Sequence, residues 1–435
     1  MKRLLEVLKS FFPQKEFLKN ENLEISNVVM DSRKIEKNSL FFGINSGNNY
    51  CEKALEMGAS IVIGDNIRED LNDPRIIRVE NTVETMQKLA NLYRKKLNLK
   101  VIGITGSNGK TTTKDLITGV LSEKYKTEKT QGNYNNHIGL PYTILSLDDD
   151  TEVAVLEMGM SSFGEIDLLC KIAQPDYGII TNIGDSHLEY LKTRENVFKA
   201  KGEMIPYIKK ENLYVYGDDP FLKDVLGNKV GFSKENDFVI DDIIDHLEYT
   251  TFKVNNKEYK ITLNGRHNCI NGAMAVGLGK AFGLSEEEIK RGLLKGDITP
   301  MRFEKIQKGD ILFINDAYNA SPTSMSFSLE TFGNLNIPKM KIAILGDMLE
   351  LGERALEFHR EIIEKAIGSN VDKIYLYGPL MSEAKKEFQN IKLRSFESKK
   401  DIISALKEEK GEKLVLLKGS RGMKLEEIIG QKEQV

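Results

Sequence analysis

The chain has 435 residues, of which 40% are hydrophobic and 29% charged, and its formal net charge is -3. This length predicts two or three domains, and the composition is typical of a globular protein rather than a disordered one. The near-neutral charge argues against nucleic acid as the main partner, and no window approaches the roughly 18 to 20 uninterrupted apolar residues of a membrane span.

The cysteines and the N-terminal residues indicate the cellular compartment in which the protein works. Cys51, Cys170 and Cys269 are far apart, and none belongs to a C-x-x-C pair. We therefore expect neither disulfides nor a zinc site, and we expect a reducing compartment, the cytoplasm. The opening MKRLLEVLKSFF places Glu6 and Lys9 among apolar residues, which predicts an amphipathic helix rather than the core of a signal peptide.

The first hundred residues predict a small α/β domain. Three segments have the short apolar runs of strands, and a helical pattern separates the last two: NVVMDSR, SLFFGIN and ASIVIGD, with CEKALEMG between. Residues 82–97 have apolar positions at helical spacing before a new strand begins. We predict the first domain over residues 1–97.

Two further α/β domains are predicted. Residues 101–104, 152–158 and 176–183 are apolar strand candidates followed by helical patterns, which indicates a parallel, helix-covered sheet in a domain of residues 98–300. After Pro300 four more apolar runs alternate with helical stretches and predict a third domain of residues 301–435: ILFINDA, KIAILGD, KIYLYG and KLVLLKG.

The strongest local pattern is GITGSNGKTTTK at residues 103–114, between a predicted buried strand and a helix. In that position the backbone N–H groups of the turn can hold phosphate oxygens, Lys110 can reach the terminal phosphates and Thr111 can bind magnesium. The usual G-x-x-x-x-G-K-[ST] spacing fails by one residue, because Ile104 stands where its first glycine belongs. The alternative is a plain glycine-rich turn.

This turn resembles the shortened phosphate loop of the Mur ligases and their folylpolyglutamate synthase relatives. Further stretches from Asp31 to Met423 resemble the same family, and their order resembles its MurF type, the D-alanyl-D-alanine-adding ligases: GNYNNHIGLP, EMGMSSFGEI, TNIGDSHLEYL, KAKGEM, GRHNCIN, MRFE, NDAYNASPTSM, LGDMLELG and LLKGSRGM.

The resemblance implies an α/β fold of three domains. A central P-loop parallel-sheet ATP-binding domain would be flanked by a small N-terminal α/β domain that binds a UDP-sugar, and by a C-terminal Rossmann-like α/β domain. The C-terminal domain would close over ATP and bind the incoming dipeptide. The nucleotide loop would comprise Gly106, Ser107, Asn108, Gly109, Lys110, Thr111 and Thr112.

The resemblance also implies two magnesium ions, held by Thr111, Glu157, His187 and Lys201. Glu157 ends an apolar strand, where carboxylates serve as metal ligands, but a lone carboxylate there can also cap a helix. His187 follows the next strand, and the alternative for it is a surface histidine. Lys201 would be carbamylated and so become anionic beside the metal, whereas lysine on a polar helix is ordinarily a solvated charge.

Other residues are assigned to the nucleotide by the resemblance. Asn268 and Asn271 are three apart on a predicted helix and therefore share a face, and amides suit the edge of adenine; the alternative is two surface amides. His267 beside them receives no role. Arg302 would reach the phosphates and Asp316 the ribose. The implied catalytic residues are Lys110, Lys201, His187 and Arg302.

Four residues are assigned to the sugar-nucleotide substrate, Ser32, Arg33, Asn135 and Asn136. An arginine beside a hydroxyl suits a diphosphate or uridine group, although D-S-R alone is more often a plain turn. The sequence departs from the family where G-x-x-x-D-G-H-x-F is expected, because NSGNNYCEKA stands there.

The implied activity is ATP-dependent joining of D-alanyl-D-alanine to UDP-N-acetylmuramoyl-tripeptide through an acyl phosphate, in a monomeric cytoplasmic enzyme of peptidoglycan synthesis with no nucleic-acid partner. Three alternatives remain: the ligase that adds the third residue, a folylpolyglutamate synthase, and a non-catalytic nucleotide switch. NDAYNASP, in place of D-x-A-H-x-P, argues against the first, and a switch does not need Lys201 or His187. The substrate's third residue is left open.

Overall fold

A computed structural model describes residues 1–430. These residues form two compact units. Unit 1 comprises Met1–Thr105, Lys124–Ile179 and Ala200–Leu213, and unit 2 comprises the rest. The predicted three-domain α/β architecture is confirmed, since each predicted domain has its own β-sheet. The boundaries near residues 97 and 300 stay predictions.

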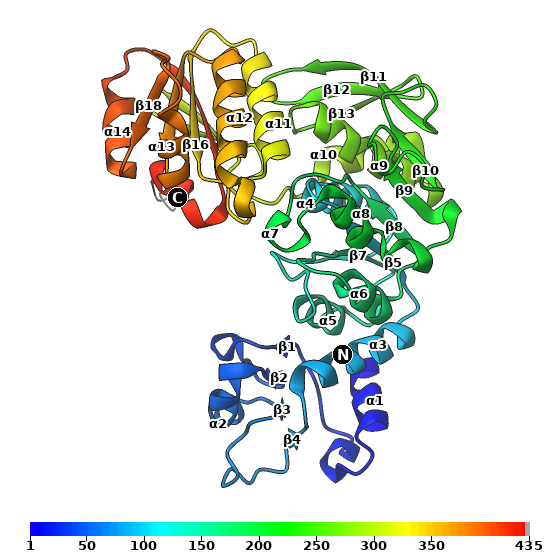
Figure 1. The fold of residues 1–435 in the computed structure, drawn as a ribbon. Helices are drawn as coiled ribbons and strands as arrows, with labels where there is room; N and C mark the ends of the chain where they lie inside the picture. The colour runs from blue at the N-terminus through cyan, green and yellow to red at the C-terminus, as the bar shows by residue number, and fades with distance from the viewer. Residues whose placement is uncertain (431–435) are drawn as a thin grey trace. The chain divides into compact units, whose positions relative to one another are not determined.

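The N-terminal sheet is wholly parallel, in the order β1 (Val28–Val29), β2 (Leu40–Gly43), β3 (Ile61–Gly64) and β4 (Ile76–Arg78). Its helices are α1 (Lys2–Phe11), α2 (Cys51–Glu56) and α3 (Thr82–Lys96), and α1 lies beside α3 (Figure 1). The predicted strand over residues 27–33 is shorter than expected, because the Asp31 side chain accepts the Arg33 N–H and starts a 3-10 turn.

The remaining strands of unit 1 lie in the order β8 (Tyr177–Ile180), β5 (Lys100–Thr105), β7 (Val153–Glu157) and β6 (Thr127–Lys129). Strands β5, β6 and β7 pair in parallel, and every residue of β7 is buried, which explains its continuous apolar sequence. Helices α5 (Gly139–Leu145) and α6 (Glu165–Ala173) complete this part. The strands predicted here are confirmed.

In unit 2, α4 (Lys110–Leu121) packs against α9 (Arg266–Ala281) and α10 (Glu286–Lys295). The short helices α7 (Leu188–Leu191) and α8 (Arg194–Gly202) precede five strands, which lie in the order β13 (Lys257–Ile261), β12 (Thr250–Val254), β11 (Phe238–Asp245), β10 (Asn228–Gly231) and β9 (Leu213–Tyr216).

The last three of these strands in the chain correct the prediction of a wholly parallel middle sheet. Strands β11, β12 and β13 are antiparallel. Buried and half-exposed residues alternate along β12, as expected for a strand with one face toward solvent. The hairpin between β12 and β13 turns at Asn255 and Asn256, both at positive φ.

The C-terminal sheet has the order β14 (Glu304–Lys308), β15 (Ile311–Asn315), β19 (Lys413–Lys418), β16 (Met340–Gly346), β17 (Lys373–Tyr377) and β18 (Leu393–Phe396). Only β14 among these is antiparallel to its neighbour. Helices α11 (Pro322–Asn334) and α12 (Ala355–Gly368) lie side by side in Figure 1, and α13 (Pro379–Lys385) and α14 (Lys399–Glu408) follow them in the chain. The four predicted strands are confirmed; β14 and β18 were not predicted.

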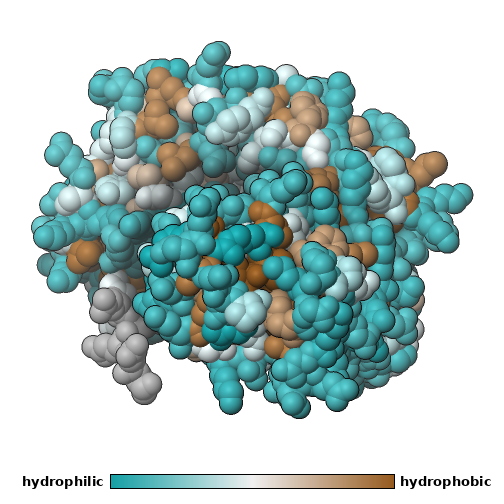
Figure 2. Space-filling model, turned by 90° about the horizontal axis from the view of Figure 1, so that it is seen from below, coloured by the Kyte–Doolittle hydropathy of each residue, from teal (hydrophilic) through white to brown (hydrophobic). Residues whose placement is uncertain are grey.

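Among residues 1–430, no helix has both the length and the hydrophobicity that a membrane crossing requires. In the view of Figure 2 hydrophilic side chains cover most of the surface, and hydrophobic ones appear between them in small groups. Scattered apolar residues of this kind are normal on a protein surface.

Candidate nucleotide-binding and ligation site

The glycine-rich turn forms a loop over the first turn of α4. Gly109 precedes the helix at φ +82°, and Lys110 is the first helical residue, as predicted. The Lys110 ammonium donates a hydrogen bond back to the Gly106 carbonyl at 2.7 Å, so the side chain spans the loop. Since the first backbone N–H groups of a helix lack intrahelical partners, this end of α4 suits an anion.

The loop is packed against the segment that follows β8. The Asn108 N–H donates to Asn182 Oδ1 at 2.9 Å, and Thr181 Oγ1 donates to the Asn108 carbonyl at 2.6 Å. A Cβ atom at Gly106 would lie 1.8 Å from Thr181 Oγ1. Only glycine fits there, so this loop is shaped by its partner segment rather than by its own sequence alone.

The two asparagines of α9 face inward beneath the loop. Asn268 and Asn271 are both buried, and Asn271 Nδ2 donates to Asn268 Oδ1 at 3.1 Å. Thr113 Oγ1 donates to Asn271 Oδ1 at 3.0 Å, and a Cβ atom at Gly109 would lie 2.8 Å from the same oxygen. The alternative of two surface amides is therefore wrong.

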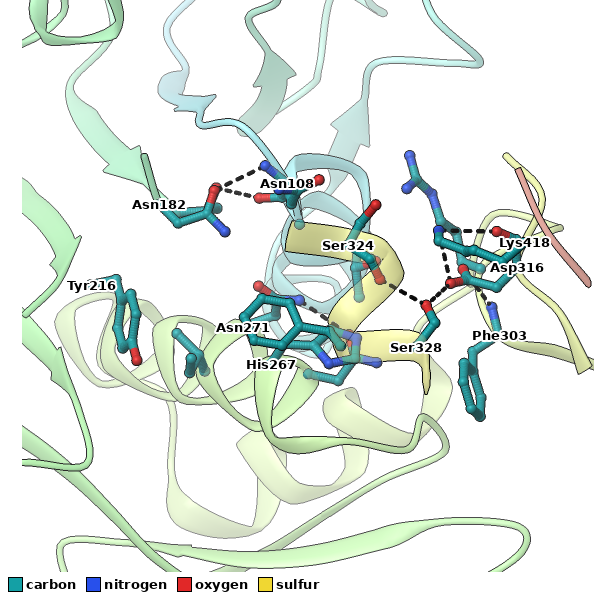
Figure 3. Close-up of a pocket in the computed structure, with 17 residues that line it drawn as sticks. Asn108, Asn182, Tyr216, His267, Asn271, Phe303, Asp316, Ser324, Ser328 and Lys418 are labelled. Atoms are coloured by element: carbon teal, nitrogen blue, oxygen red, sulfur yellow. Dashed lines mark hydrogen bonds and ion pairs between the residues drawn. The ribbon is translucent and has the colours of Figure 1, made fainter. Parts of the chain in front are cut away.

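A cavity opens between α9 and α11 (Figure 3). The His267 ring stacks on Phe327, with centroids 5.3 Å apart and planes 12° apart. Burial lowers the pKa of His267 to about 4, so the imidazole is neutral at pH 7. The lining combines the aromatic side chains of Tyr216, Phe303 and Phe327 with many polar groups, which suits a flat heterocycle that forms hydrogen bonds at its edge. The lining residues include Asn108, Gly109, Thr112, Asn268, Asn271, Arg302, Asp316 and Lys418.

Asp316 lies at the far side of this cavity from the loop's Asn108 (Figure 3). Its carboxylate accepts hydrogen bonds from the Phe303 N–H at 3.2 Å and from the Ser328 hydroxyl, and it pairs with the Lys418 ammonium at 2.9 Å. Lys418 is buried, and this burial lowers its pKa. The carboxylate is thus fixed in orientation by three donors.

Arg302 connects the cavity to the phosphate loop. Its Nη2 donates to Thr111 Oγ1 at 3.2 Å, and its guanidinium lies 4.2 Å from the centroid of the Tyr318 ring. Among residues 1–430, Arg302 Nε and Asn108 Nδ2 are buried donors with no hydrogen-bond acceptor. Because buried polar groups are normally satisfied, both donors are available to acceptors of a ligand in this cavity.

A second cavity adjoins the first, since Asn108 lines both. Ser107, Lys110 and His187 line it on one side, and Ser420 and Arg421 are among its other lining residues. His187 has φ +56°, and its Nδ1 lies 3.2 Å from Glu350 Oε2. The cavity thus combines two basic side chains of the predicted site with the loop after β16.

Glu157 and Asn135 lie together in unit 1. Glu157 is buried at the end of β7, and its Oε1 accepts a hydrogen bond from Asn135 Nδ2 at 2.8 Å. The Glu157 N–H donates to Thr130 Oγ1 at 2.9 Å. Asn136 has a structural bond as well, since its Oδ1 accepts the Gly139 N–H at the start of α5.

Lys201 and the Asp31–Ser32–Arg33 turn differ in exposure. Lys201 is only 1% exposed, so the alternative of a solvated helix charge is wrong. Arg33 is exposed, and its backbone N–H and guanidinium both bind Asp31. These bonds hold the pKa of Asp31 down at about 2. Ser32 is partly exposed in the same turn.

Unit 2 thus brings together the loop residues Gly106 to Thr112 with His187, Asn268, Asn271, Arg302 and Asp316. Unit 1 holds Ser32, Arg33, Asn135, Asn136, Glu157 and Lys201. In residues 1–430 no three histidine, cysteine, aspartate or glutamate side chains form a metal-binding group. The sequence reasoning missed Thr181, Asn182, Phe327, Ser328 and Lys418. Three of them, Thr181, Asn182 and Lys418, lie in the stretches TNIG and KGSRG, which were the only sequence patterns that pointed to them.

Comparisons with known proteins identify the family of the chain. Residues 104–279 match the family model of the Mur ligase middle domain, and residues 301–421 match that of the Mur ligase, glutamate ligase domain. The chain is 40% identical over 449 residues to UDP-N-acetylmuramoyl-tripeptide–D-alanyl-D-alanine ligase of Bacillus subtilis (strain 168), covering 99% of this chain and 97% of that protein.

Solved structures give the same picture. The chain superimposes on a crystal structure of MurF from Acinetobacter baumannii with a TM-score of 0.87 at 27% identity, covering 98% of this chain and 97% of that one. It superimposes on MurF ligase from Thermotoga maritima in complex with ADP with a TM-score of 0.82 at 30% identity, covering 94% and 97%.

Proposed function

Since the chain belongs to the Mur ligase family, we propose that it joins D-alanyl-D-alanine to UDP-N-acetylmuramoyl-tripeptide and converts ATP to ADP and phosphate in doing so. The product would be the UDP-MurNAc-pentapeptide of peptidoglycan synthesis. The relatives in B. subtilis and in Borreliella burgdorferi, the second 32% identical over 95% of this chain, carry the name of this ligase. The single observation that carries the proposal is that the phosphate loop borders both cavities, since its residue Asn108 lines each of them.

ATP would occupy the first cavity with its phosphates at the start of α4. The neutral His267, stacked on Phe327, and the amides of Asn268 and Asn271 would hold adenine. Asp316, fixed by its three donors, would bind the ribose. Lys110 and Arg302 would lie along the phosphates, where their positive charges favour the charge of the transferring group.

Magnesium fits the donors that the chain offers. The ion prefers oxygen ligands, and the Thr111 hydroxyl and the Glu157 carboxylate are of that type. We assign Thr111, Glu157, His187 and Lys201 to two such ions. When bound, magnesium neutralises phosphate charge and polarises the phosphoryl group.

Lys201 suits this role only if it is carbamylated. An ammonium would repel a divalent cation, whereas a carbamate is anionic. The burial of Lys201 supports a special environment rather than a solvated charge. The role also gives this lysine a function that a simple nucleotide switch does not need.

The reaction would proceed in two steps. The carboxylate of the tripeptide attacks the γ-phosphorus, which gives an acyl phosphate and ADP. The free amine of D-alanyl-D-alanine then attacks the acyl carbon, the tetrahedral intermediate expels inorganic phosphate, and the amine loses a proton. The chain's contribution would be positioning by Asn108, Ser107 and Arg302 and charge neutralisation by Lys110.

The two substrates would enter from different parts of the chain. Ser32, Arg33, Asn135 and Asn136 of unit 1 would bind the UDP precursor, and the second cavity would take the dipeptide. We assign residues 1–97 to the UDP-sugar domain, 98–300 to the ATPase domain, and 301–435 to a domain that closes over ATP. We further propose a monomer in the cytoplasm.

One experiment separates the rival functions. The protein is incubated with ATP, magnesium and D-alanyl-D-alanine, with and without UDP-MurNAc-tripeptide, and the product mass and released phosphate are measured. The proposed ligase gives a pentapeptide product only when both substrates are present. A ligase for the third residue, a folylpolyglutamate synthase or a nucleotide switch would give none. A panel of tripeptide precursors then identifies the third residue.

A further inference from the structure

The loop that follows β16, residues 347–351, forms part of the second cavity. Leu349, Glu350 and Leu351 line that cavity, and Glu350 Oε2 lies 3.2 Å from His187 Nδ1. Glu350 has φ +64°, a conformation that non-glycine residues adopt rarely. Such a residue persists only where its neighbours hold the backbone in place.

Two of the anchors of this loop come from Ser420. The Ser420 N–H donates to the Asp347 carbonyl at 3.0 Å, and Ser420 Oγ accepts the Leu349 N–H at 2.9 Å. Between them, the Met348 N–H donates to Nε2 of His359 at 2.9 Å. Three consecutive residues of the loop, Asp347 to Leu349, are therefore each bonded to a residue outside the loop.

His359 makes its bond from behind the loop. It lies on α12, and its side chain is fully buried. Its Nδ1 is 2.6 Å from the Ala355 carbonyl oxygen. Since a carbonyl can only accept, Nδ1 carries the proton and Nε2 presents a lone pair. Burial lowers the pKa of His359 and favours this neutral form.

The Asp347 carboxylate lies near His359 but is hydrogen-bonded to other groups. Asp347 Oδ1 lies 3.9 Å from His359 Nε2, beyond hydrogen-bonding distance. The Asp347 carboxylate accepts the backbone N–H groups of Leu380 and Met381 at 3.1 and 2.8 Å. The Met348 N–H is thus the group that occupies the His359 lone pair.

We propose that His359 is a positioning residue for ligation: its Nε2 lone pair holds the Met348 N–H, and so presents Leu349 and Glu350 to the second cavity. The kinetic part of this role rests on the proposed ligase function. The geometric part, the anchoring of the loop, does not. His359 touches no substrate in this role and acts only through the loop.

Two amide substitutions test the lone pair specifically. The side-chain amide of His359→Gln reaches about as far as Nε2 and can accept from Met348, whereas that of His359→Asn reaches only as far as Nδ1. Ile363→Val is the matched control, because it shortens another buried side chain of α12 without removing a polar bond. All three variants are assayed with ATP, magnesium, UDP-MurNAc-tripeptide and D-alanyl-D-alanine.

We expect His359→Asn to lower kcat/KM for the dipeptide about tenfold, because one hydrogen bond to the loop is lost. KM for ATP should not change, and amide exchange of residues 347–351 should accelerate. His359→Gln and Ile363→Val should stay near wild type in all three measurements. The proposal would be overturned if His359→Gln and His359→Asn lowered kcat/KM equally, or if His359→Asn had no effect. The same loss in Ile363→Val would also overturn it.

Two measurements keep this test separate from the proposed function. If the wild-type protein forms no pentapeptide, the ligase function fails, and hydrogen exchange still decides whether His359 anchors the loop. Nitrogen NMR of the His359 ring in the wild-type protein needs no variant. An unprotonated Nε2 supports the anchor, and a protonated Nε2 overturns it.

Discussion

The phosphate loop and the Asp31–Ser32–Arg33 turn both follow a strand, but they are held in opposite ways. The loop is bonded to Thr181 and Asn182, more than 70 residues away in the chain, whereas the turn is bonded to itself through Asp31 and Arg33. A segment held by distant partners is preorganised for a ligand. An exposed turn that is bonded only to itself must fix the Arg33 side chain when the substrate binds. The entropy lost in this step reduces what Arg33 contributes to affinity.

The largest effect is expected at the loop. Lys110→Ala should lower turnover by about 10³-fold or more, because the ammonium that spans the loop would contact the transferring phosphates. Thermal unfolding should change little. Lys280→Ala, an exposed lysine at the end of α9, is the control. A folded Lys110→Ala enzyme with normal turnover would remove the phosphate-loop assignment.

Lys201 extends the comparison to a buried charge in unit 1. Lys201→Ala should reduce turnover by on the order of 10²- to 10³-fold, because it removes the proposed carbamate. Added acetate or formate should restore part of the activity, and a cationic additive should not. Lys199→Ala, exposed on the same helix, should be silent. Near-normal turnover in folded Lys201→Ala would end the carbamate hypothesis.

Glu157 tests whether burial at a strand end marks a metal ligand. Glu157→Ala should lower activity by about 10²-fold and raise the magnesium concentration needed for half-maximal rate. Glu152→Ala, an exposed carboxylate just before the same strand, should leave the magnesium titration unchanged. An unaltered titration in Glu157→Ala would make the residue structural.

Asn271 should have an intermediate effect. Asn271→Ala should weaken ATP by about 10- to 100-fold, which corresponds to roughly 1 to 3 kcal/mol for a buried hydrogen-bonding group. Binding of the UDP precursor should hardly change, since the precursor is assigned to unit 1. Calorimetric titration of both ligands measures this. An equal loss for both would indicate misfolding.

The smallest effect is expected at the exposed turn. Arg33→Ala should raise KM for the UDP precursor only a few fold, because an exposed ion pair contributes little. The pKa of Asp31 is lowered to about 2, so the pair stays charged above that pH and is lost only as the pH falls through it. The ratio of KM in Arg33→Ala to KM in the wild type should therefore stay constant from about pH 5 to 9. A change above tenfold, or one matched by Lys34→Ala, would contradict this.

The sequence predicted the elements whose pattern is local. Strand β7 and the C-terminal strands β16, β17 and β19 are buried apolar runs, and α4 begins at Lys110 as predicted. The antiparallel strands β11 to β13 escaped prediction because most of their residues are exposed or partly exposed, so that no continuous apolar run marks them. A polar alternation of this kind resembles a loop or a helix surface in a short window.

Spacing alone predicted parts of the site only where residues lie close in sequence, whereas the family resemblance supplied His187, Arg302 and Asp316, which line the two cavities. Asn268 and Asn271 could be placed on one helical face, but not inside the protein, because the contacts that enclose them come from other parts of the chain, such as the bond from Thr113 on another helix to Asn271. The Asp316–Lys418 pair joins residues about a hundred positions apart, and the bond between Met348 and His359 depends on a lone pair in a tautomer. No spacing in the sequence reports such contacts.

The backbone of the phosphate loop also limits how this protein could escape an inhibitor. A compound that hydrogen-bonds to the N–H groups at the start of α4 would recognise main-chain atoms, which a point mutation does not remove. Substitution at Gly106 or Gly109 would drive a side chain into Thr181 or Asn271. If the compound also reached the His267–Phe327 stack, resistance would have to arise there, where side chains rather than backbone make the contact.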